Sequence, residues 1–472
     1  MKSNSFPFLT TCLLLGLLSG CAVGPDYQKP EPALPSGYSE GEPDSTRFDW
    51  WDRFGDETLG RLLQSTMENN YSLEAGRQRI LKARGVLEAV RGTNLPQLGI
   101  NASVIRQERS ENSLFPVLEN NPDFPERTET LYHASFDASW EIDIFGGNRN
   151  RIKIGELQVD RADLALRDLQ ASLLAETGRL YITYLVFTEQ LQFLEESIII
   201  NQKLQDVVNA RFKAGTVSEL DVAQARARLN QWQARKPGLQ AEQEAVLQGL
   251  SILTLLSAEE LNELLEDKMS IPEVESFLGD RIDSMALQNR PDVRIAENSI
   301  QQANAELGIQ ISNLYPRFTL VGSLGLESIE VDTFTTSASR LWRLGPTITL
   351  PVFEGGTLRN RAKAAEAELK LRIAEYKQLV WQALSETEAA MIRFNHGIDE
   401  SNYSRQAWES TASACSKAEN QYDAGILPLD RLLFLQAEQL AARDRLTQSR
   451  GQSALNLIAL SKSLGGGWDF GQ

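Results

Sequence analysis

Few side chains in this 472-residue sequence could carry catalysis or hold a metal. The two histidines, His133 and His396, lie far apart in the chain, whereas zinc sites gather several His or Cys ligands at close spacing. Glycines 465–467 follow a predicted helix and precede no strand–helix unit, so they do not form a phosphate-binding loop. No motif of a serine hydrolase, a zinc protease or a redox cysteine pair is present. The sequence therefore predicts neither an enzyme nor a metal site.

One cysteine near the N-terminus has a clear chemical role. Lys2 precedes an apolar stretch at about residues 8–18, and Leu18-Ser19-Gly20-Cys21 follows. A short apolar stretch that ends in small residues is typical of a secretory signal peptide, here residues 1–20. Its ending resembles the bacterial lipobox, in which the Cys21 thiol is acylated, so covalent lipid is the one added group expected. The alternative is an ordinary signal peptide with an incidental cysteine.

The remaining cysteines and the net charge exclude further classes. Cys12 leaves with the signal peptide, so Cys415 remains alone and an intrachain disulfide is excluded. A formal net charge of -17 argues against a nucleic-acid partner, because phosphate binding needs a basic surface. No later stretch reaches the roughly 18 consecutive apolar residues of a membrane-spanning helix. If the protein crosses a membrane, it must do so as a closed β-barrel.

The sequence also contains an internal repeat. Segments that begin at Asn70 and Arg290 match without a gap at an offset of 220 residues. The matched pairs are Leu73 with Val293, Ala83 with Ala303, Leu87 with Leu307 and Pro96 with Pro316. Further along, Arg211–Gly215 resembles Gln421–Gly425. A register kept over this length defines the architecture, so the chain is predicted to consist of two copies of one unit.

Each repeat contains two candidate strands. Between Tyr132 and Ile144 apolar and polar residues alternate strictly, which is typical of a strand with one apolar and one wet face. Pro346 predicts a local break in the last strand. The lengths suit membrane strands of about 9–11 residues. The expected strands are residues 97–107, 131–145, 317–327 and 340–353.

Four strands per chain are too few to close a barrel, because the smallest membrane barrels use about eight. An open-edged sheet in lipid would leave backbone groups without hydrogen bonds. Two copies would give eight strands and three would give twelve, and the physical argument leaves both open. The alternative is a soluble four-stranded sheet that packs its apolar face on helices, which the signal peptide and the lipobox disfavour.

Long helices are expected after each strand pair. From Leu166 to Ile198 apolar residues keep a spacing of three and four, which predicts coiled-coil packing, although shorter amphipathic helices in a bundle remain an alternative. Gly215 and Gly425 should end helices in the left-handed conformation. Pro237-Gly238 should kink or interrupt the first return helix. The predicted helices are residues 148–214, 218–258, 357–424 and 429–464.

Taken in order, six segments resemble the outer-membrane efflux protein family of TolC and OprM, in its NodT-type lipoprotein branch. They are Gly20–Tyr27, Trp50–Asp56, Arg211–Asp221, Asn289–Val293, Leu350–Gly356 and Leu464–Trp468. The resemblance implies an α+β fold with an internal duplication. Three chains would form a twelve-stranded outer-membrane β-barrel, continued by a long periplasmic α-helical coiled-coil barrel.

The resemblance also implies a division of the chain and a function. The parts are a signal peptide (1–20), a lipid-anchored N-terminal segment (21–56), two repeats (57–270 and 281–464) and a C-terminal tail (465–472). The function would be a passive exit duct of a tripartite efflux system. The alternative is a structural coiled-coil envelope lipoprotein or adhesin without a pore, which has no need of the duplicated strand pairs. The sequence does not specify the exported molecule.

Finally, the resemblance implies a homotrimer, anchored by lipid in the cell outer membrane with its helices in the periplasm. Its partners would be a periplasmic adaptor, or membrane fusion protein, and an inner-membrane pump of the RND type. The adaptor-contact residues at the helix tips would be Gly215, Ser218, Leu220, Asp221, Gly425 and Leu429.

The gate at the helical end departs from the family pattern. An aspartate commonly precedes the Ala-Glu or Ala-Gln pair of the last helix, whereas here Gln436 does so, at a longer spacing from Gly425 than is usual. Asp430 and Asp423 are therefore candidates for the constricting charge, alongside Gln436 as the positional counterpart. Three like carboxylates near one axis repel, so a closed ring needs compensating contacts or protonation.

Overall fold

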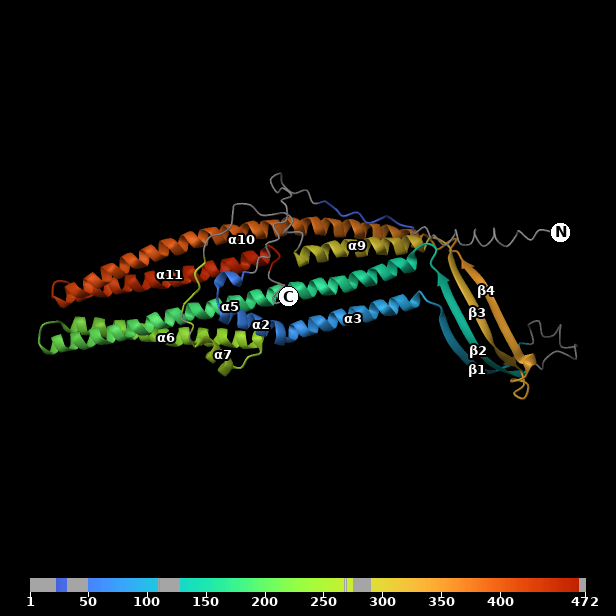
Figure 1. Cartoon of the computed structure of the whole chain (residues 1–472), viewed down its shortest axis with the longest axis horizontal. Coiled ribbons are helices and arrows are strands. Elements are labelled where there is room, and N and C mark those ends of the chain that lie inside the picture. Colours follow the sequence, from blue (N-terminus) through green and yellow to red (C-terminus); the bar gives the residue numbers. More distant parts are fainter. Residues whose placement is uncertain are drawn as a thin grey trace. The chain divides into compact units, whose positions relative to one another are not determined.

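The computed structural model describes residues 23–31, 50–108, 110, 128–266, 268, 270–274 and 290–466. The predicted lipid anchor Cys21, the signal peptide and residues 467–472 lie outside them. The chain divides into two compact units, labelled element by element in Figure 1. The strand unit comprises Met1–Pro30, Ile80–Arg161 and Glu297–Glu375, and the hairpin unit comprises Glu31–Arg79, Ala162–Ala296 and Tyr376–Gln472.

The strand unit contains one antiparallel sheet in the order β1-β2-β3-β4, visible as four neighbouring arrows in Figure 1. Its strands are β1 (Gln97–Glu108), β2 (Thr128–Ile142), β3 (Arg317–Ser328) and β4 (Arg340–Thr349). β4 runs through Pro346, which pairs with Leu320, so the predicted break in this strand was wrong. β4 is an edge strand of the sheet in a single chain, where the missing N–H of proline need not remove a ladder bond.

Cross-strand register gives the sheet two different faces, because residues directly opposite each other project to the same side. One face carries the row Ile100, Phe136, Leu324 and Trp342, and we name it the apolar face. The other carries the row Gly99, Asp137, Ser323 and Arg343, and we name it the polar face. The alternation seen in the sequence therefore continues in register across all four strands.

Helix segments of the strand unit pack through small and polar contacts. They come from α3 (Tyr71–Thr93), α5 (Gly147–Lys213), α9 (Pro291–Ser312) and α10 (Thr357–Asp423). A Cβ at Gly155 would lie 3.0 Å from the Leu87 side chain, so α3 and α5 approach closely there. Asn298 Nδ2 donates to the Leu157 carbonyl at 3.0 Å, which links α9 to α5.

An extended N-terminal strap, residues 23–30, is also bound to this unit. The Val23 N–H donates to the Phe145 carbonyl, and Lys29 Nζ lies 3.1 Å from Glu297 on α9. A Cβ at Gly24, whose φ is +127°, would meet the Gly308 Cα at 3.1 Å. Only glycine tolerates both that φ and that approach, which explains the Val-Gly-Pro sequence just after Cys21.

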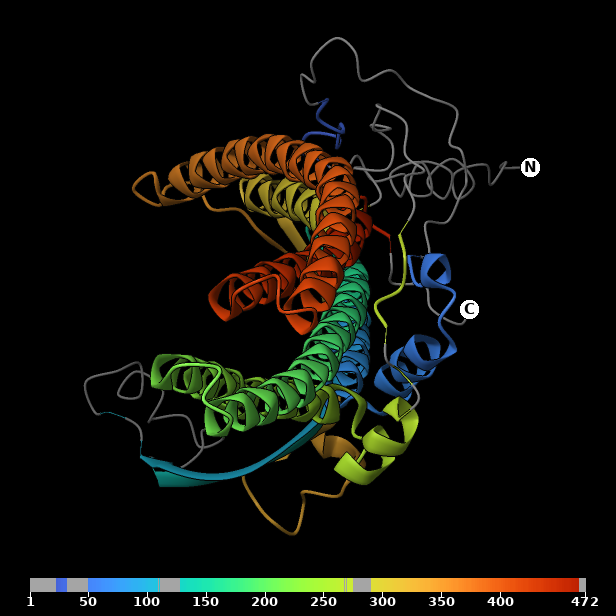
Figure 2. The same ribbon diagram turned by 90° about the vertical axis from the view of Figure 1, so that its left-hand side faces the viewer.

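The hairpin unit contains two antiparallel helical hairpins, α5–α6 and α10–α11, whose tips face the viewer in Figure 2. The return helices are α6 (Glu219–Thr254) and α11 (Leu429–Ser463), and the shorter elements are η1 (Asp52–Phe54), α2 (Glu57–Asn69) and α7 (Ala258–Leu265). Their core gathers around Trp50, Tyr181 and Phe394, each at most 1% exposed. A Cβ at Gly178 would lie 2.3 Å from the Trp50 ring, so that glycine makes room for the tryptophan.

α6 continues through Pro237 to Thr254, so the predicted interruption at Pro237-Gly238 is absent and the helix ends before residue 258. Pro237 and Gln233, whose carbonyl loses its helical partner, are both exposed. Water can satisfy such a carbonyl, and the helix can therefore pass through the proline on its solvent side.

Candidate channel faces and hairpin tips

The apolar face of the sheet is uncovered in the single chain. Leu98 is 81% exposed, Phe136 66% and Trp342 75%, and similar side chains adjoin them on all four strands. An apolar surface this continuous marks contact with lipid or with another chain. Tyr132 and Trp140 lie eight residues apart on β2, about 26 Å at roughly 3.3 Å per residue. Membrane barrels carry an apolar band about 25 Å tall between aromatic girdles, which this spacing matches.

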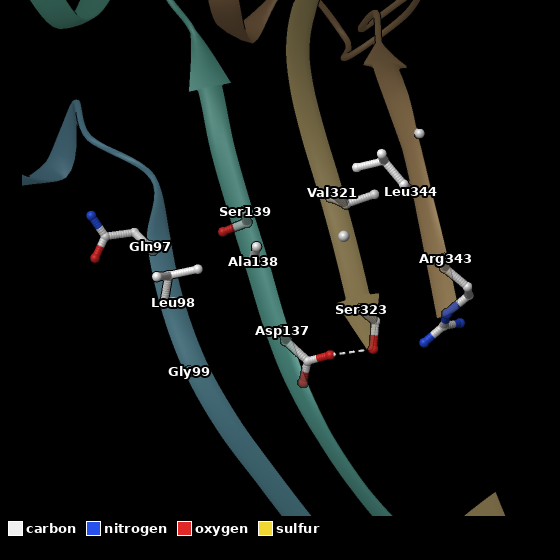
Figure 3. Close-up of a pocket in the computed structure, with 12 residues that line it drawn as sticks. Gln97, Leu98, Gly99, Asp137, Ala138, Ser139, Val321, Ser323, Arg343 and Leu344 are labelled. Atoms are coloured by element: carbon white, nitrogen blue, oxygen red, sulfur yellow. Dashed lines mark hydrogen bonds between the residues drawn. The ribbon is translucent and has the colours of Figure 1, made fainter. Parts of the chain in front are cut away.

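The polar face of β2 and β3 is joined by side-chain hydrogen bonds. Ser323 Oγ donates to Asp137 Oδ1 at 2.7 Å, and Ser135 Oγ donates to Asp137 Oδ2 at 3.0 Å. Figure 3 shows the Asp137–Ser323 bond, with Arg343 on the neighbouring strand β4. A hollow of about 810 Å³ lies here and is lined by residues of all four strands. The face is thus wet and charged opposite an apolar one.

The two hairpin tips turn in the same way. Gly215 and Gly425 both have φ of +73°, and each donates its N–H to the carbonyl three residues earlier, Phe212 at 2.8 Å and Tyr422 at 2.9 Å. The N–H of the following residue, Thr216 or Ile426, reaches one residue further back. This pair of bonds is the left-handed helix ending expected from the sequence. The contact of these glycines with an adaptor stays a prediction.

The first tip begins its return helix with a reciprocal cap. Ser218 N–H donates to Asp221 Oδ2 at 2.7 Å, and Asp221 N–H donates to Ser218 Oγ at 3.3 Å. The Ser218 hydroxyl and N–H lower the pKa of Asp221, because both donate to its carboxylate. Asp221 is therefore occupied within the turn, whereas Leu220 beside it is 65% exposed and free to contact a partner.

The second tip lacks this cap and differs in what it exposes. Pro428 precedes α11 and makes no side-chain capping bond. Leu429 is 6% exposed and belongs to a small core at the tips, formed by Val208, Ala225, Ala418, Tyr422, Leu429 and Leu432. Ile426 is 75% exposed instead. The adaptor-contact residue predicted at Leu429 is thus buried in the single chain, and Ile426 presents the apolar surface.

One contact at the tips escaped the sequence argument. The Arg211 guanidinium lies over the Tyr422 ring at 4.7 Å from its centroid, so it joins the two hairpins beside the tip core. A cation over an aromatic face is attracted by about 0.5–2 kcal/mol. The only signal in the sequence was that Tyr422 occupies the position of Phe212 in the repeat.

The three gate candidates lie in different environments. Asp423 and Asp430 are exposed on the second tip. Gln436 is 7% exposed, and its Oε1 has no hydrogen-bond partner among the described residues. The glutamine at the position of the family aspartate therefore points into the protein, and the two carboxylates are the accessible charges.

The Arg290-Pro291-Asp292 motif joins two helix ends. Arg290 Nη1 donates to the Ser463 carbonyl at 3.1 Å, and Nη2 donates to Asp292 at 2.8 Å and Glu386 at 2.9 Å. Burial alone would raise the pKa of Asp292, but the Arg290 guanidinium outweighs it and the pKa is lowered. The motif thus ties the start of α9 to the end of α11 and is a structural feature.

A buried carboxylate joins α5 to α11. Glu189, with its side chain 4% exposed, accepts from Arg443 at 2.9 Å and from Arg450 at 3.3 Å. Arg450 also donates to the Ile271 carbonyl at 2.7 Å. No hydrophobic pattern in the sequence identified this cluster.

Two searches of the described residues found nothing. Among them, no three His, Cys, Asp or Glu side chains are arranged to hold a metal ion. Within the same residues, no helix is apolar over a length sufficient to span a membrane.

Comparison with known proteins gives consistent matches over the whole chain. The sequence profile of the family described as "Outer membrane efflux protein" matches residues 62–254 and 283–466. The solvent efflux pump outer membrane protein SrpC of Pseudomonas putida is 26% identical over 491 residues, with all of both chains covered. Nodulation protein T of Rhizobium leguminosarum bv. viciae is 24% identical over 98% of this chain and 93% of its own. The solved structure of the outer-membrane channel OprN superposes with a TM-score of 0.85 at 28% identity, covering 95% and 100% of the two chains.

Proposed function

Because the chain belongs to the outer membrane efflux protein family, we propose that three copies form one passive exit duct for small molecules. The fold is TolC-like, with two repeats, four antiparallel strands and long helices in each chain. The protein is the outer-membrane channel component of an efflux system, with a periplasmic helical portion, and is not an enzyme.

The observation that carries the trimer proposal is the four-stranded sheet with two open edges. Its exposed apolar face suits lipid, and its hydrogen-bonded polar face suits a watery lumen. In lipid the outer edges of β1 and β4 need partners. Because the strands alternate in direction, β4 of one copy can pair antiparallel with β1 of the next, and three copies make twelve strands.

A lipid anchor on Cys21 fits the position of the strap. Val23, two residues after Cys21, is bound to the Phe145 carbonyl just beyond the end of β2. The strap thus begins beside an end of the sheet, where an acyl chain could reach the bilayer that holds the strands. We propose that the mature chain starts at Cys21 and is acylated there.

The hairpin tips are proposed to contact a periplasmic adaptor that serves an inner-membrane pump of the RND type. Leu220 and Ile426 present exposed apolar side chains at the two turns, while Gly215, Ser218, Asp221 and Gly425 shape those turns. Asp430 and Asp423 are the proposed gate charges, since both are accessible.

Cross-linking of the sheet edges tests the duct directly. In a Cys415→Ser background, Asn101→Cys on β1 is combined in turn with Arg343→Cys, Gly345→Cys or Thr347→Cys on β4. We expect covalent dimers and trimers for at least one pair, together with ion conductance in planar bilayers. The matched control pairs Asn101→Cys with Ser323→Cys on the inner strand β3, which should stay monomeric. A chain that neither cross-links nor conducts would refute the duct.

A further inference from the structure

His133 lies in the hydrogen-bonded chain of the polar face. Its Nδ1 is 3.2 Å from Glu327 Oε2 on β3, and its Nε2 is 3.0 Å from Ser135 Oγ on β2. Ser135 in turn donates to Asp137, which also accepts from Ser323. A continuous polar path therefore crosses from Glu327 through the imidazole to Asp137.

Donors and acceptors along this path match fully in only one protonation state. An ionised carboxylate only accepts, so the Glu327 contact needs a proton on Nδ1. Ser135 has a single proton, which it gives to Asp137, so Nε2 must donate to the serine oxygen. Both ring nitrogens carry protons in the doubly protonated imidazolium alone. In the neutral ring either the Glu327 bond is lost or Ser135 turns its proton away from Asp137.

The charges beside this imidazole nearly balance. On the polar face Glu327 faces it from β3, Asp137 and Glu129 share its own strand, and Arg343 lies on β4. On β1 it is opposite the uncharged Ser103, and Gln107 donates to Glu129 at 2.6 Å. With His133 charged, the group of Glu327, Asp137, Arg343 and His133 is neutral. With His133 uncharged, the same group carries one net negative charge.

We propose that this His133 cluster is a charge filter of the duct lumen, which makes the pore more cation-selective as pH rises through the imidazole range. The inference rests on the proposed trimer, in which three clusters face one lumen. Imidazole changes charge between about pH 5 and 8. Three clusters would together add three negative charges to the wall. Fixed charge of one sign in a narrow aqueous space concentrates the opposite ion.

Reversal potentials in planar bilayers test the filter. Under a tenfold KCl gradient with a dilute side of about 0.01 M, the Debye length there is about 30 Å, so wall charges act far into the lumen. The potassium-to-chloride permeability ratio of the wild type should rise about twofold between pH 5.5 and 8.0, as the imidazoles lose charge. His133→Gln should remove this rise, because glutamine bonds without titrating.

The matched control is His396→Gln on α10, which removes the only other histidine and should keep the full pH response. Glu327→Gln provides an independent variant, expected to shift selectivity towards chloride at both pH values. A wild-type ratio that does not change with pH would overturn the filter while leaving the duct intact, as would a response that persists in His133→Gln. Absence of any conductance would overturn the duct and the filter together.

Discussion

Replacing Asp56 with alanine is expected to loosen α2 from the core of the hairpin unit. Asp56 caps α2 by accepting the Thr58 N–H on Oδ1 at 2.9 Å. Its Oδ2 accepts from the Tyr181 hydroxyl at 2.6 Å, and Lys268 Nζ lies 3.0 Å from Oδ1. Tyr181 is fully buried, so no solvent acceptor replaces the lost carboxylate. One substitution thus removes a helix cap and leaves a buried hydroxyl without a partner.

The size of the effect follows from these two losses. Removal of an N-cap aspartate costs about 1 kcal/mol. A buried hydroxyl without an acceptor costs about 1–3 kcal/mol. Together they destabilise α2 by about 2–4 kcal/mol, which multiplies the equilibrium constant for local opening by roughly 30 to 900.

Hydrogen exchange of the α2 amides in the full-length protein measures this opening. Asp56→Ala should accelerate exchange in α2 by the factor above and leave exchange in the tip segments unchanged. Asp56→Asn is the matched control, because its side-chain oxygen still caps the helix and its effect should be smaller. Exchange rates in Asp56→Ala within threefold of the wild type would refute the assignment of Asp56 as a cap and acceptor.

The same carboxylate predicts a pH dependence. Burial alone would raise the pKa of Asp56, but the Tyr181 hydroxyl, Lys268 and the Thr58 N–H outweigh it and the pKa is lowered. A lowered folded-state pKa gives stability that is fully present above the unfolded value of about 3.9 and is lost as pH falls through the folded value. Exchange in α2 should therefore accelerate below about pH 4 in the wild type, with a weaker response in Asp56→Asn.

Three further substitutions test other contacts. Glu189→Ala leaves Arg443 and Arg450 without their buried partner and should cost about 3–5 kcal/mol, seen as faster protease cleavage of α11, with Glu189→Gln milder. Gly215→Ala forces a left-handed φ on a Cβ and should cost about 1–2 kcal/mol in exchange at the first tip. Gly60→Ala, in an open right-handed position of α2, should instead stabilise by about 0.5–1 kcal/mol. Arg290→Ala should speed exchange at the end of α11 more than Arg294→Ala does, since Arg290 binds the Ser463 carbonyl.

Much of the strand unit could be predicted because its signals are local. Alternation from Tyr132 onward defines both faces of β2, and a two-residue period needs no knowledge of the neighbouring strands. The repeat then transferred that assignment to β3. Prolines were misjudged for a related reason: the cost at Pro237 and Pro346 depends on solvent access and edge position, which the local sequence does not contain.

The remaining contacts depend on register between distant segments. His133 meets Glu327 across 194 residues, and Glu189 meets Arg450 across 261. The helix stripe was also imperfect as a guide, because Leu174 and Tyr181 are fully buried while Leu173 and Tyr184 of the predicted stripe are half-buried. A long helix buries one stripe in its own chain and can present the adjacent one to another chain, and spacing alone does not separate the two.

The two repeats differ in length only between their strands, and this has a physical cause. β1 and β3 keep the offset of 220 residues (317 − 97), whereas α5 and α10 are both 67 residues long at an offset of 210 (357 − 147). The strand connections absorb the difference. The outgoing helices match in length because their tips share one small core, with Val208 from α5 and Ala418 and Tyr422 from α10.

That constraint predicts opposite responses to the same insertion. One alanine inserted after Gln202 on α5 rotates the first tip by about 100° and moves it by about 1.5 Å, which carries Val208 and Arg211 away from Tyr422. Exchange at both tips should then accelerate at least tenfold. One glycine inserted after Asp332, in the exposed β3–β4 connection, should leave tip exchange and conductance unchanged. Equal tolerance of both insertions would mean that the tip core does not set the helix length.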